Sequence, residues 1–158
     1  MKQILIIGTG NLLRGDDGAG IRAVQEIARR YPAMECITAH GLMPEMAERI
    51  IRADLVLFVD ASVRTPDVRV SHLSGEGASP LEDAHGFTPA GLLSFAGKVY
   101  GQRVPDAVLF EIPVVSTDLN DRLSAGAEAS VREVISRIDV LLAAGGCQGR
   151  FPKAAVEK

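Results

Sequence analysis

Four residues could bind a metal ion or take part in catalysis: three acids that come after short apolar runs, and one histidine in a polar loop. Asp16 and Asp17 lie in a glycine-rich segment after the first apolar run, Asp60 directly follows the run 55–59, and His85 lies in a later loop. Two carboxylates and an imidazole form an oxygen, oxygen, nitrogen set that suits a divalent transition metal with open coordination positions. Such a site requires a fold that brings these residues together.

Helix capping is the structural alternative for the acids. An Asp at a helix N-terminus accepts bonds from free N–H groups and complements the helix dipole. Two adjacent residues cannot both be the N-cap, so we expect either Asp16 or Asp17 to cap the following helix. The other is a ligand or surface charge. For Asp60, a turn cap and a functional acid both remain open.

The other histidines have weaker functional signals. His40 follows a predicted strand beside Gly41, and it either faces the same crevice as the acids or caps a turn. His72 lies in a segment of alternating apolar and polar residues, which is typical of a half-exposed edge strand. We expect His72 to be a solvated surface residue.

The glycine-rich segment does not match a nucleotide-binding loop. Gly8 and Gly10 fit the start of a dinucleotide fingerprint, but Leu13 replaces its third glycine and His40 replaces the ribose-binding acid. Gly10 and Gly15 have the spacing of a phosphate loop, but acidic residues 16–17 occupy the place of its Lys-Ser/Thr pair and would repel phosphate. We therefore expect no nucleotide cofactor.

The elements that position these residues alternate along the chain between strands and helices. Continuous apolar runs predict buried strands, and apolar residues at helical spacing predict amphipathic helices. Strands are predicted at 3–8, 34–39, 55–59, 67–73 and 107–112, and helices at 20–31, from about 44, from 88–89 and at 123–144, with a loop at 74–86. This alternation predicts an α/β fold with a mostly parallel sheet covered by helices on both faces. If the first and third strands are neighbours, Asp16, Asp17 and Asp60 share the crevice at the switch point of the sheet.

Composition narrows the class of protein. The chain has 158 residues, 47% of them hydrophobic, and a net charge of -3. We expect one domain over 1–145 and a flexible tail over 146–158. The charge argues against nucleic-acid binding and a polybasic membrane contact, and no apolar stretch is long enough to span a membrane. We find no targeting segment, and Cys36 and Cys147 form no metal or redox motif, so we expect free thiols in a cytoplasmic protein.

The segment Gly8-Thr9-Gly10-Asn11-Leu12-Leu13-Arg14-Gly15-Asp16-Asp17-Gly18-Ala19-Gly20 resembles the amino-terminal signature of the nickel–iron hydrogenase maturation endopeptidases. Val59-Asp60-Ala61 and the loop histidine His85 resemble two further motifs of that family, in the same order. The resemblance extends over roughly residues 3 to 142. It implies a three-layer α/β/α sandwich around a five-stranded, mostly parallel sheet with one antiparallel edge strand.

The resemblance also implies an activity and a site. The activity is removal of a carboxy-terminal extension from the hydrogenase large-subunit precursor after nickel insertion, and we expect an aspartic-type endopeptidase. The catalytic and metal-contacting residues would be Asp17, Asp60 and His85, and Asp16 would shape the loop. The nickel would be presented by the precursor. At Ala39-His40-Gly41 the sequence departs from the family pattern, because many members carry Asp-Gly-Gly there, and we expect a supporting role for His40.

Two other functions remain open at this stage. A receiver-like, magnesium-dependent signalling module also places acids after its first and third strands, but this chain has no Lys at the end of its last strand. A nickel-binding accessory protein without peptidase activity would need the same three ligands as the peptidase. We expect a monomer that meets its substrate transiently.

Overall fold

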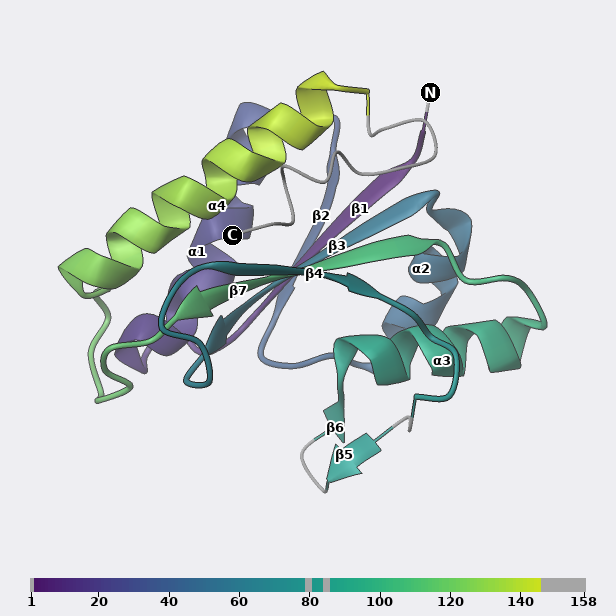
Figure 1. Cartoon of the computed structure of the whole chain (residues 1–158), viewed down its shortest axis with the longest axis horizontal. Helices are drawn as coiled ribbons and strands as arrows, with labels where there is room; N and C mark the ends of the chain where they lie inside the picture. Colours follow the sequence, from purple (N-terminus) through teal and green to yellow (C-terminus); the bar gives the residue numbers. More distant parts are fainter. Residues whose placement is uncertain (1, 79–80, 84–85, 146–158) are drawn as a thin grey trace.

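A five-stranded sheet forms the centre of the molecule (Figure 1). The computed structural model describes residues 2–78, 81–83 and 86–145 of the chain. The sheet has the strand order β2-β1-β3-β7-β4. Its strands are β1 (Ile4–Thr9), β2 (Glu35–Ala39), β3 (Leu55–Ser62), β4 (Arg69–Leu73) and β7 (Asp106–Pro113). All neighbours pair in parallel except β4, which runs antiparallel to β7 at one edge.

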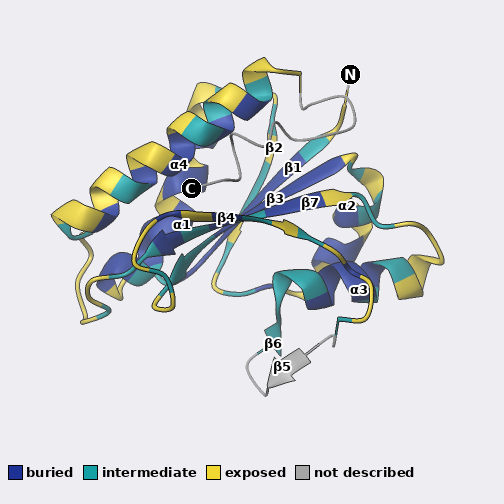
Figure 2. Cartoon of the chain, in the orientation of Figure 1, coloured by how far each residue is buried: buried dark blue, intermediate teal, exposed yellow. Residues whose placement is uncertain are grey.

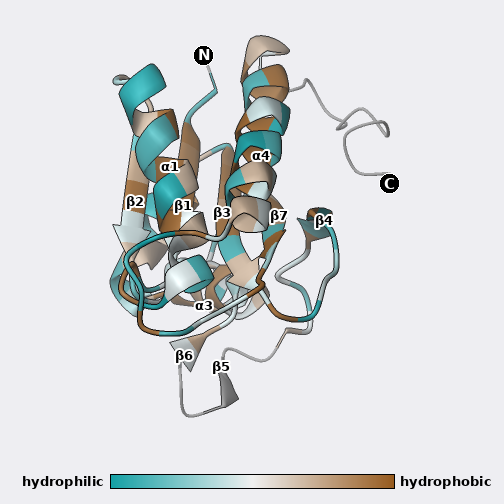
Figure 3. Ribbon diagram, turned by 90° about the vertical axis from the view of Figure 1, so that its left-hand side faces the viewer, coloured by the Kyte–Doolittle hydropathy of each residue, from teal (hydrophilic) through white to brown (hydrophobic). Residues whose placement is uncertain are grey.

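Helices cover both faces of this sheet. The helices are α1 (Ala19–Arg30), α2 (Ala47–Arg52), α3 (Pro89–Tyr100) and α4 (Ala125–Ala143). Helices α1 and α4 lie on one face and α2 and α3 on the other (Figure 1). The central strands β1, β3 and β7 are buried between these two layers (Figure 2), and the hydrophobic sides of α1 and α4 face the sheet (Figure 3). The predicted three-layer α/β/α fold is confirmed.

Alternation along each strand divides the apolar residues between two cores. Ile6, Leu57 and Phe110 face α1 and α4, whereas Leu5 and Phe58 face α2 and α3. Because successive side chains of a strand point to opposite faces, Asp60 must lie on the same side of the sheet as Phe58. This places its carboxyl group toward α3.

Local sequence signals locate several helix ends. The Gly91 N–H donates to Thr88 Oγ1 at 2.9 Å, and Pro89 occupies the first helical position, as the sequence predicts for the start of α3. Ser124 caps α4 in the same way, because its Oγ accepts from the Ala127 N–H at 3.1 Å.

The sequence prediction missed three short elements, the 3-10 helix η1 (Gly15–Gly18) and the strands β5 (Leu81–Asp83) and β6 (Gly86–Phe87), and it gave the 3-10 helix η2 (Pro44–Met46) and α2 as one helix. Helix η1 lies within the glycine-rich segment, and η2 precedes α2. The segment 74–86 was expected to be a loop, but it contributes to a small hairpin of β5 and β6. Strands of three and two residues are too short to give a periodic pattern in the sequence.

The described part of the chain has no helix that is long and apolar enough to cross a membrane. Cys36 is a free thiol. The predicted tail 146–158, which includes Cys147, lies outside the described residues, and the domain limits stay a prediction.

Candidate functional site

The strand order reverses between β1 and β3. From β1 the chain passes to β2 on one side, then crosses back to β3 on the other side of β1. The two strands pair in parallel with Gly8 opposite Val59, so their carboxyl ends meet at one edge of the sheet. Open α/β sheets bind ligands at such a switch point. The expected neighbour relation between the first and third strands is therefore confirmed.

The glycines of the first loop allow close packing of backbone against backbone. Gly10 has a φ of 144°, a conformation that favours glycine, and a Cβ there would overlap the Asp17 carbonyl oxygen. A Cβ at Gly20 would lie 2.5 Å from the Val59 carbonyl oxygen and 2.7 Å from that of Thr9. The first turn of α1 therefore rests directly on the ends of β1 and β3, and this holds η1 over the crevice.

Asp16 is a buried structural carboxylate, only 1% exposed. Its Oδ2 accepts from the Val115 N–H at 2.9 Å, the Ser116 N–H at 3.1 Å and the Ser124 hydroxyl at 2.8 Å, and its Oδ1 accepts from the Ser124 N–H at 2.7 Å. Burial alone would raise the pKa of Asp16, but these hydrogen bonds outweigh it and hold the pKa below its usual value.

The prediction that Asp16 or Asp17 caps the following helix was wrong. Neither end of η1 nor the start of α1 has a side-chain cap, and Gly18 is the N-cap residue of α1. Asp16 turns away from its own helix because the segment after β7 offers it four donors at once. The supporting role expected for Asp16 agrees with this geometry.

The loop after β1 is also fastened to the loop after β7 through backbone bonds. The Gly15 N–H donates to the Asn120 carbonyl at 2.8 Å, the Asn120 N–H donates to the Leu13 carbonyl at 3.0 Å, and the Asp16 N–H donates to the Ser116 carbonyl at 2.9 Å. The partners are separated by about a hundred positions, so no local pattern in the sequence could have indicated the contact. The pairing fixes the position of Asp17 relative to the sheet.

Asp60 lies at the end of β3 in the crevice. Its Oδ1 accepts from the Ala61 N–H at 2.9 Å. Removal from water raises the pKa of Asp60 to about 6, although hydrogen bonds from the Thr9 side chain and Ala61 oppose the shift. The negative charges of Asp17 and Glu111 raise the pKa further. Asp17 and Asp60 are therefore close enough to interact, as the sequence predicted.

A row of polar side chains crosses the sheet at this level. Because Gly8 pairs with Val59, the next residues, Thr9 and Asp60, are also neighbours. Asp60 pairs with Glu111 of β7, which pairs with Arg69 of β4. Sequence analysis missed Glu111, although a charged residue inside the otherwise apolar run 107–112 is a signal that could have found it.

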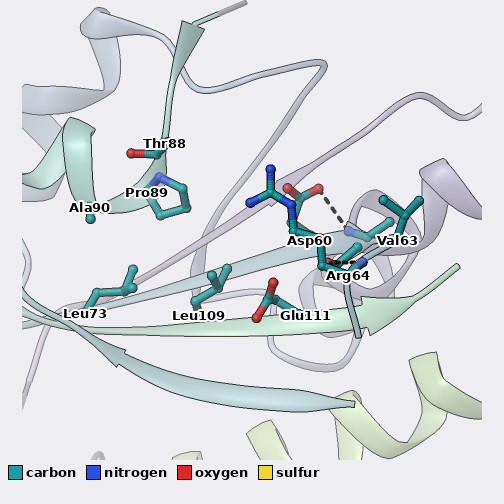
Figure 4. A pocket seen from close by; sticks show the side chains of 11 residues that line it. Asp60, Val63, Arg64, Leu73, Thr88, Pro89, Ala90, Leu109 and Glu111 are labelled. Atoms are coloured by element: carbon teal, nitrogen blue, oxygen red, sulfur yellow. Dashed lines mark hydrogen bonds between the residues drawn. The ribbon is translucent and has the colours of Figure 1, made fainter. Parts of the chain in front are cut away.

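A cleft of about 430 Å³ opens beside this row. Asp60, Leu109 and Glu111 line it from the sheet, and Thr88, Pro89 and Ala90 line it from the start of α3 (Figure 4). The cleft therefore combines an apolar wall with the carboxyl groups of Asp60 and Glu111, and the guanidinium of Arg64 also lines it (Figure 4).

Of the three histidines, His40 and His72 lie within the described residues and His85 does not. His85 lies outside the described residues, so its predicted place in the site stays a prediction. His40 is exposed at the carboxyl end of β2, and the expected surface position of His72 on β4 is confirmed. Within the described ranges no group of three or more His, Cys, Asp or Glu residues could hold a metal ion.

Comparison with proteins of known structure gives matches over nearly the whole chain. HycI, a [NiFe] hydrogenase maturation protease from Thermococcus kodakarensis KOD1, is 25% identical with a TM-score of 0.66, covering 90% of this chain and 93% of that one. The hydrogenase 2 maturation peptidase from Thaumarchaeota archaeon SCGC_AB-539-E09 is 26% identical with a TM-score of 0.63, covering 91% and 99%. The hydrogenase maturating endopeptidase HybD from E. coli is 19% identical with a TM-score of 0.66, covering 90% and 94%.

The chain has the fold of the solved hydrogenase maturation proteases. A short sequence match agrees: 37 residues are 46% identical to the hydrogenase expression/formation protein HupD of Bradyrhizobium diazoefficiens. That match spans 23% of this chain and 19% of HupD. No protein-family model matches the chain. The resemblance that the sequence indicated is therefore confirmed, and the crevice with Asp17 and Asp60 lies within the hydrogenase maturation protease fold.

Proposed function

We propose that this protein is an endopeptidase that removes a carboxy-terminal extension from the nickel-loaded precursor of a hydrogenase large subunit. The observation that carries the proposal is the meeting of Asp17 and Asp60 at the switch point of a fold shared with solved maturation proteases. Two interacting carboxylates in one crevice favour a bound cation.

In this proposal the nickel belongs to the substrate. The carboxylates of Asp17 and Asp60, together with His85, engage the nickel that the precursor already holds, so metal loading permits cleavage. Asp16 holds the loop that carries Asp17, and His40 lies at the same edge of the sheet. Without the metal the pKa of Asp60 is about 6, so at neutral pH most of its carboxyl group is ionised and ready to engage a cation.

The surroundings of the crevice suit a protein substrate. Several large apolar side chains are exposed on the loops that leave the carboxyl ends of the parallel strands. These residues, which we call the apolar rim, are Leu13, Met43, Val63, Val115 and Leu119. We propose that the rim contacts the precursor, and that the protein acts in the cytoplasm as a monomer without a nucleotide cofactor.

Intact-mass spectrometry of the precursor tests this function. A nickel-loaded precursor incubated with the protein should lose one discrete carboxy-terminal peptide, and a metal-free precursor should keep its mass. Unchanged mass of the loaded precursor, with stable binding of the protein to it, would instead support a nickel-binding accessory role. Cleavage of both precursors alike would remove nickel from the proposal.

A further inference from the structure

We propose that Glu111 is a positioning residue of the crevice, that it adds negative charge beside Asp60, and that Arg69 is the counter-ion that limits this charge. The inference rests on the proposed function, because it states how this site attracts a cationic centre held by the precursor. In this inference Glu111 does not bind the cation directly. Its negative charge strengthens the attraction of the crevice for the cation that Asp17 and Asp60 engage.

The position of Glu111 in the sheet carries the inference. Glu111 lies directly opposite Asp60 across the β3–β7 pairing, and both side chains line the cleft (Figure 4). Its side chain is only 16% exposed, so its charge is poorly screened by water.

Arg69 balances Glu111 from the far side. Its Nε lies 3.3 Å from Glu111 Oε2, and the register of β4 on β7 places the two residues opposite each other. Arg69 is 63% exposed, so its partner is far more buried than the arginine itself. An ion pair with a largely exposed arginine adds little to the stability of the fold. We therefore assign the pair an electrostatic role, in which Arg69 partly neutralises the charge that Glu111 places beside Asp60.

Removing the two members of the pair should therefore have opposite effects on a cation in the crevice. Glu111→Gln removes a negative charge near Asp60 and leaves Arg69 uncompensated, which weakens attraction. Arg69→Gln leaves Glu111 uncompensated, which strengthens it. A pair that is merely structural would give changes of the same sign in both variants, so the sign of the Arg69 effect distinguishes the two explanations.

The first measurement uses Ni²⁺ alone on the ¹⁵N-labelled full chain. Paramagnetic broadening of the Gly18 and Ala61 amide signals reports Ni²⁺ at the crevice even when binding is weak. We expect about three- to tenfold weaker binding in Glu111→Gln and a comparable strengthening in Arg69→Gln, as one unit charge at this range would give. Glu133→Gln and Arg137→Gln, which break an Arg–Glu pair on α4, should leave binding unchanged.

The second measurement separates this inference from the proposed function. In steady-state processing of the nickel-loaded precursor, Glu111→Gln should raise KM several-fold and Arg69→Gln should not raise it, with melting temperatures near that of the wild type. The role of Glu111 would be overturned if both substitutions changed the affinity for Ni²⁺ in the same direction, or if Ni²⁺ broadened neither signal in the wild type. Either result would count even if the precursor is processed. Wild-type protein that binds Ni²⁺ with the expected pattern but does not process the precursor would overturn the function and leave the electrostatic role standing.

Discussion

At the scale of single residues, the two adjacent acids of the first loop have different tasks. Asp16 is buried and accepts four hydrogen bonds from the segment after β7, whereas Asp17 is half-buried and its charge acts on Asp60. The sequence could indicate that two neighbouring acids need different explanations. It could not indicate which acid is structural, because the four donors come from residues about a hundred positions away.

Replacing Asp16 should therefore cost stability. Asp16→Ala leaves three backbone N–H groups and one hydroxyl without their acceptor, and we expect a loss of about 2–4 kcal/mol in the free energy of unfolding. Denaturant unfolding of the variant and the wild type measures this loss. Asp121→Ala is a suitable control, because Asp121 is exposed in the same segment and its backbone carbonyl, which the substitution keeps, accepts from Arg22. A loss below about 0.5 kcal/mol in Asp16→Ala would contradict the structural role.

The pKa of Asp60 makes stability depend on pH. Its folded value of about 6 lies above the ordinary value of an Asp, so the folded protein binds this proton more tightly than the unfolded chain does. The resulting stabilisation is complete below about pH 4 and is lost as the pH rises through about 6. Asp60→Asn cannot ionise, and we expect it to be about 2 kcal/mol more stable than the wild type at pH 7, with the difference shrinking toward pH 4. Unfolding curves at several pH values measure this, and parallel pH profiles of the two proteins would refute it.

At the scale of elements, Gly20 lets α1 pack directly against the ends of β1 and β3, because it has no side chain. The space between Gly20 and the carbonyl oxygens of Val59 and Thr9 is too small for a Cβ atom. The sequence predicted both strands and the helix from their apolar periodicity. The close approach of helix to strand has no local signal in the sequence, because the space at Gly20 depends on the ends of two separate strands.

Gly20→Ala should push α1 away from the sheet and separate Asp17 from Asp60. We expect a loss of about 1–3 kcal/mol in the free energy of unfolding, as for other overpacked sites. Gly126→Ala is the matched control, since Gly126 also lies in a helix and its nearest neighbour would be 3.6 Å from the new Cβ. Thermal unfolding should show Gly126→Ala to be neutral or stabilised by up to about 1 kcal/mol. Equal melting temperatures for both variants would argue against close packing at Gly20.

At the scale of the whole molecule, the fold could be predicted almost completely and the site only in part. Buried strands, amphipathic helices and proline-marked ends are local signals, and the family resemblance implied five strands with one antiparallel strand at an edge. The contact between the loops after β1 and β7 depends on tertiary structure, as does the row from Thr9 to Arg69. Asp60 could be predicted because it follows a buried strand. The charge of Glu111 inside an apolar run could mark it as unusual, but only the register places it beside Asp60.

The apolar rim gives a prediction at this scale. Leu119 is 87% exposed on the loop after β7, and we expect Leu119→Ser to weaken the complex with the precursor by about 1 kcal/mol, or about fivefold in KM. Val140→Ser is the control, because Val140 is an exposed apolar residue on α4, outside the loops of the rim. Processing kinetics should show a higher KM for Leu119→Ser alone, with kcat preserved. An equal effect of both substitutions would place the contact elsewhere.

The most direct test of the site is processing of the nickel-loaded precursor by Asp17→Asn, followed by intact-mass spectrometry. Asp106→Asn is the control, because Asp106 is exposed at the amino end of β7, at the opposite edge of the sheet. We expect Asp17→Asn to fold with an unchanged melting temperature and to leave the precursor at its full mass, while Asp106→Asn releases the carboxy-terminal peptide as the wild type does. Release of the peptide by Asp17→Asn at the wild-type rate would contradict the assignment of this crevice as the active site.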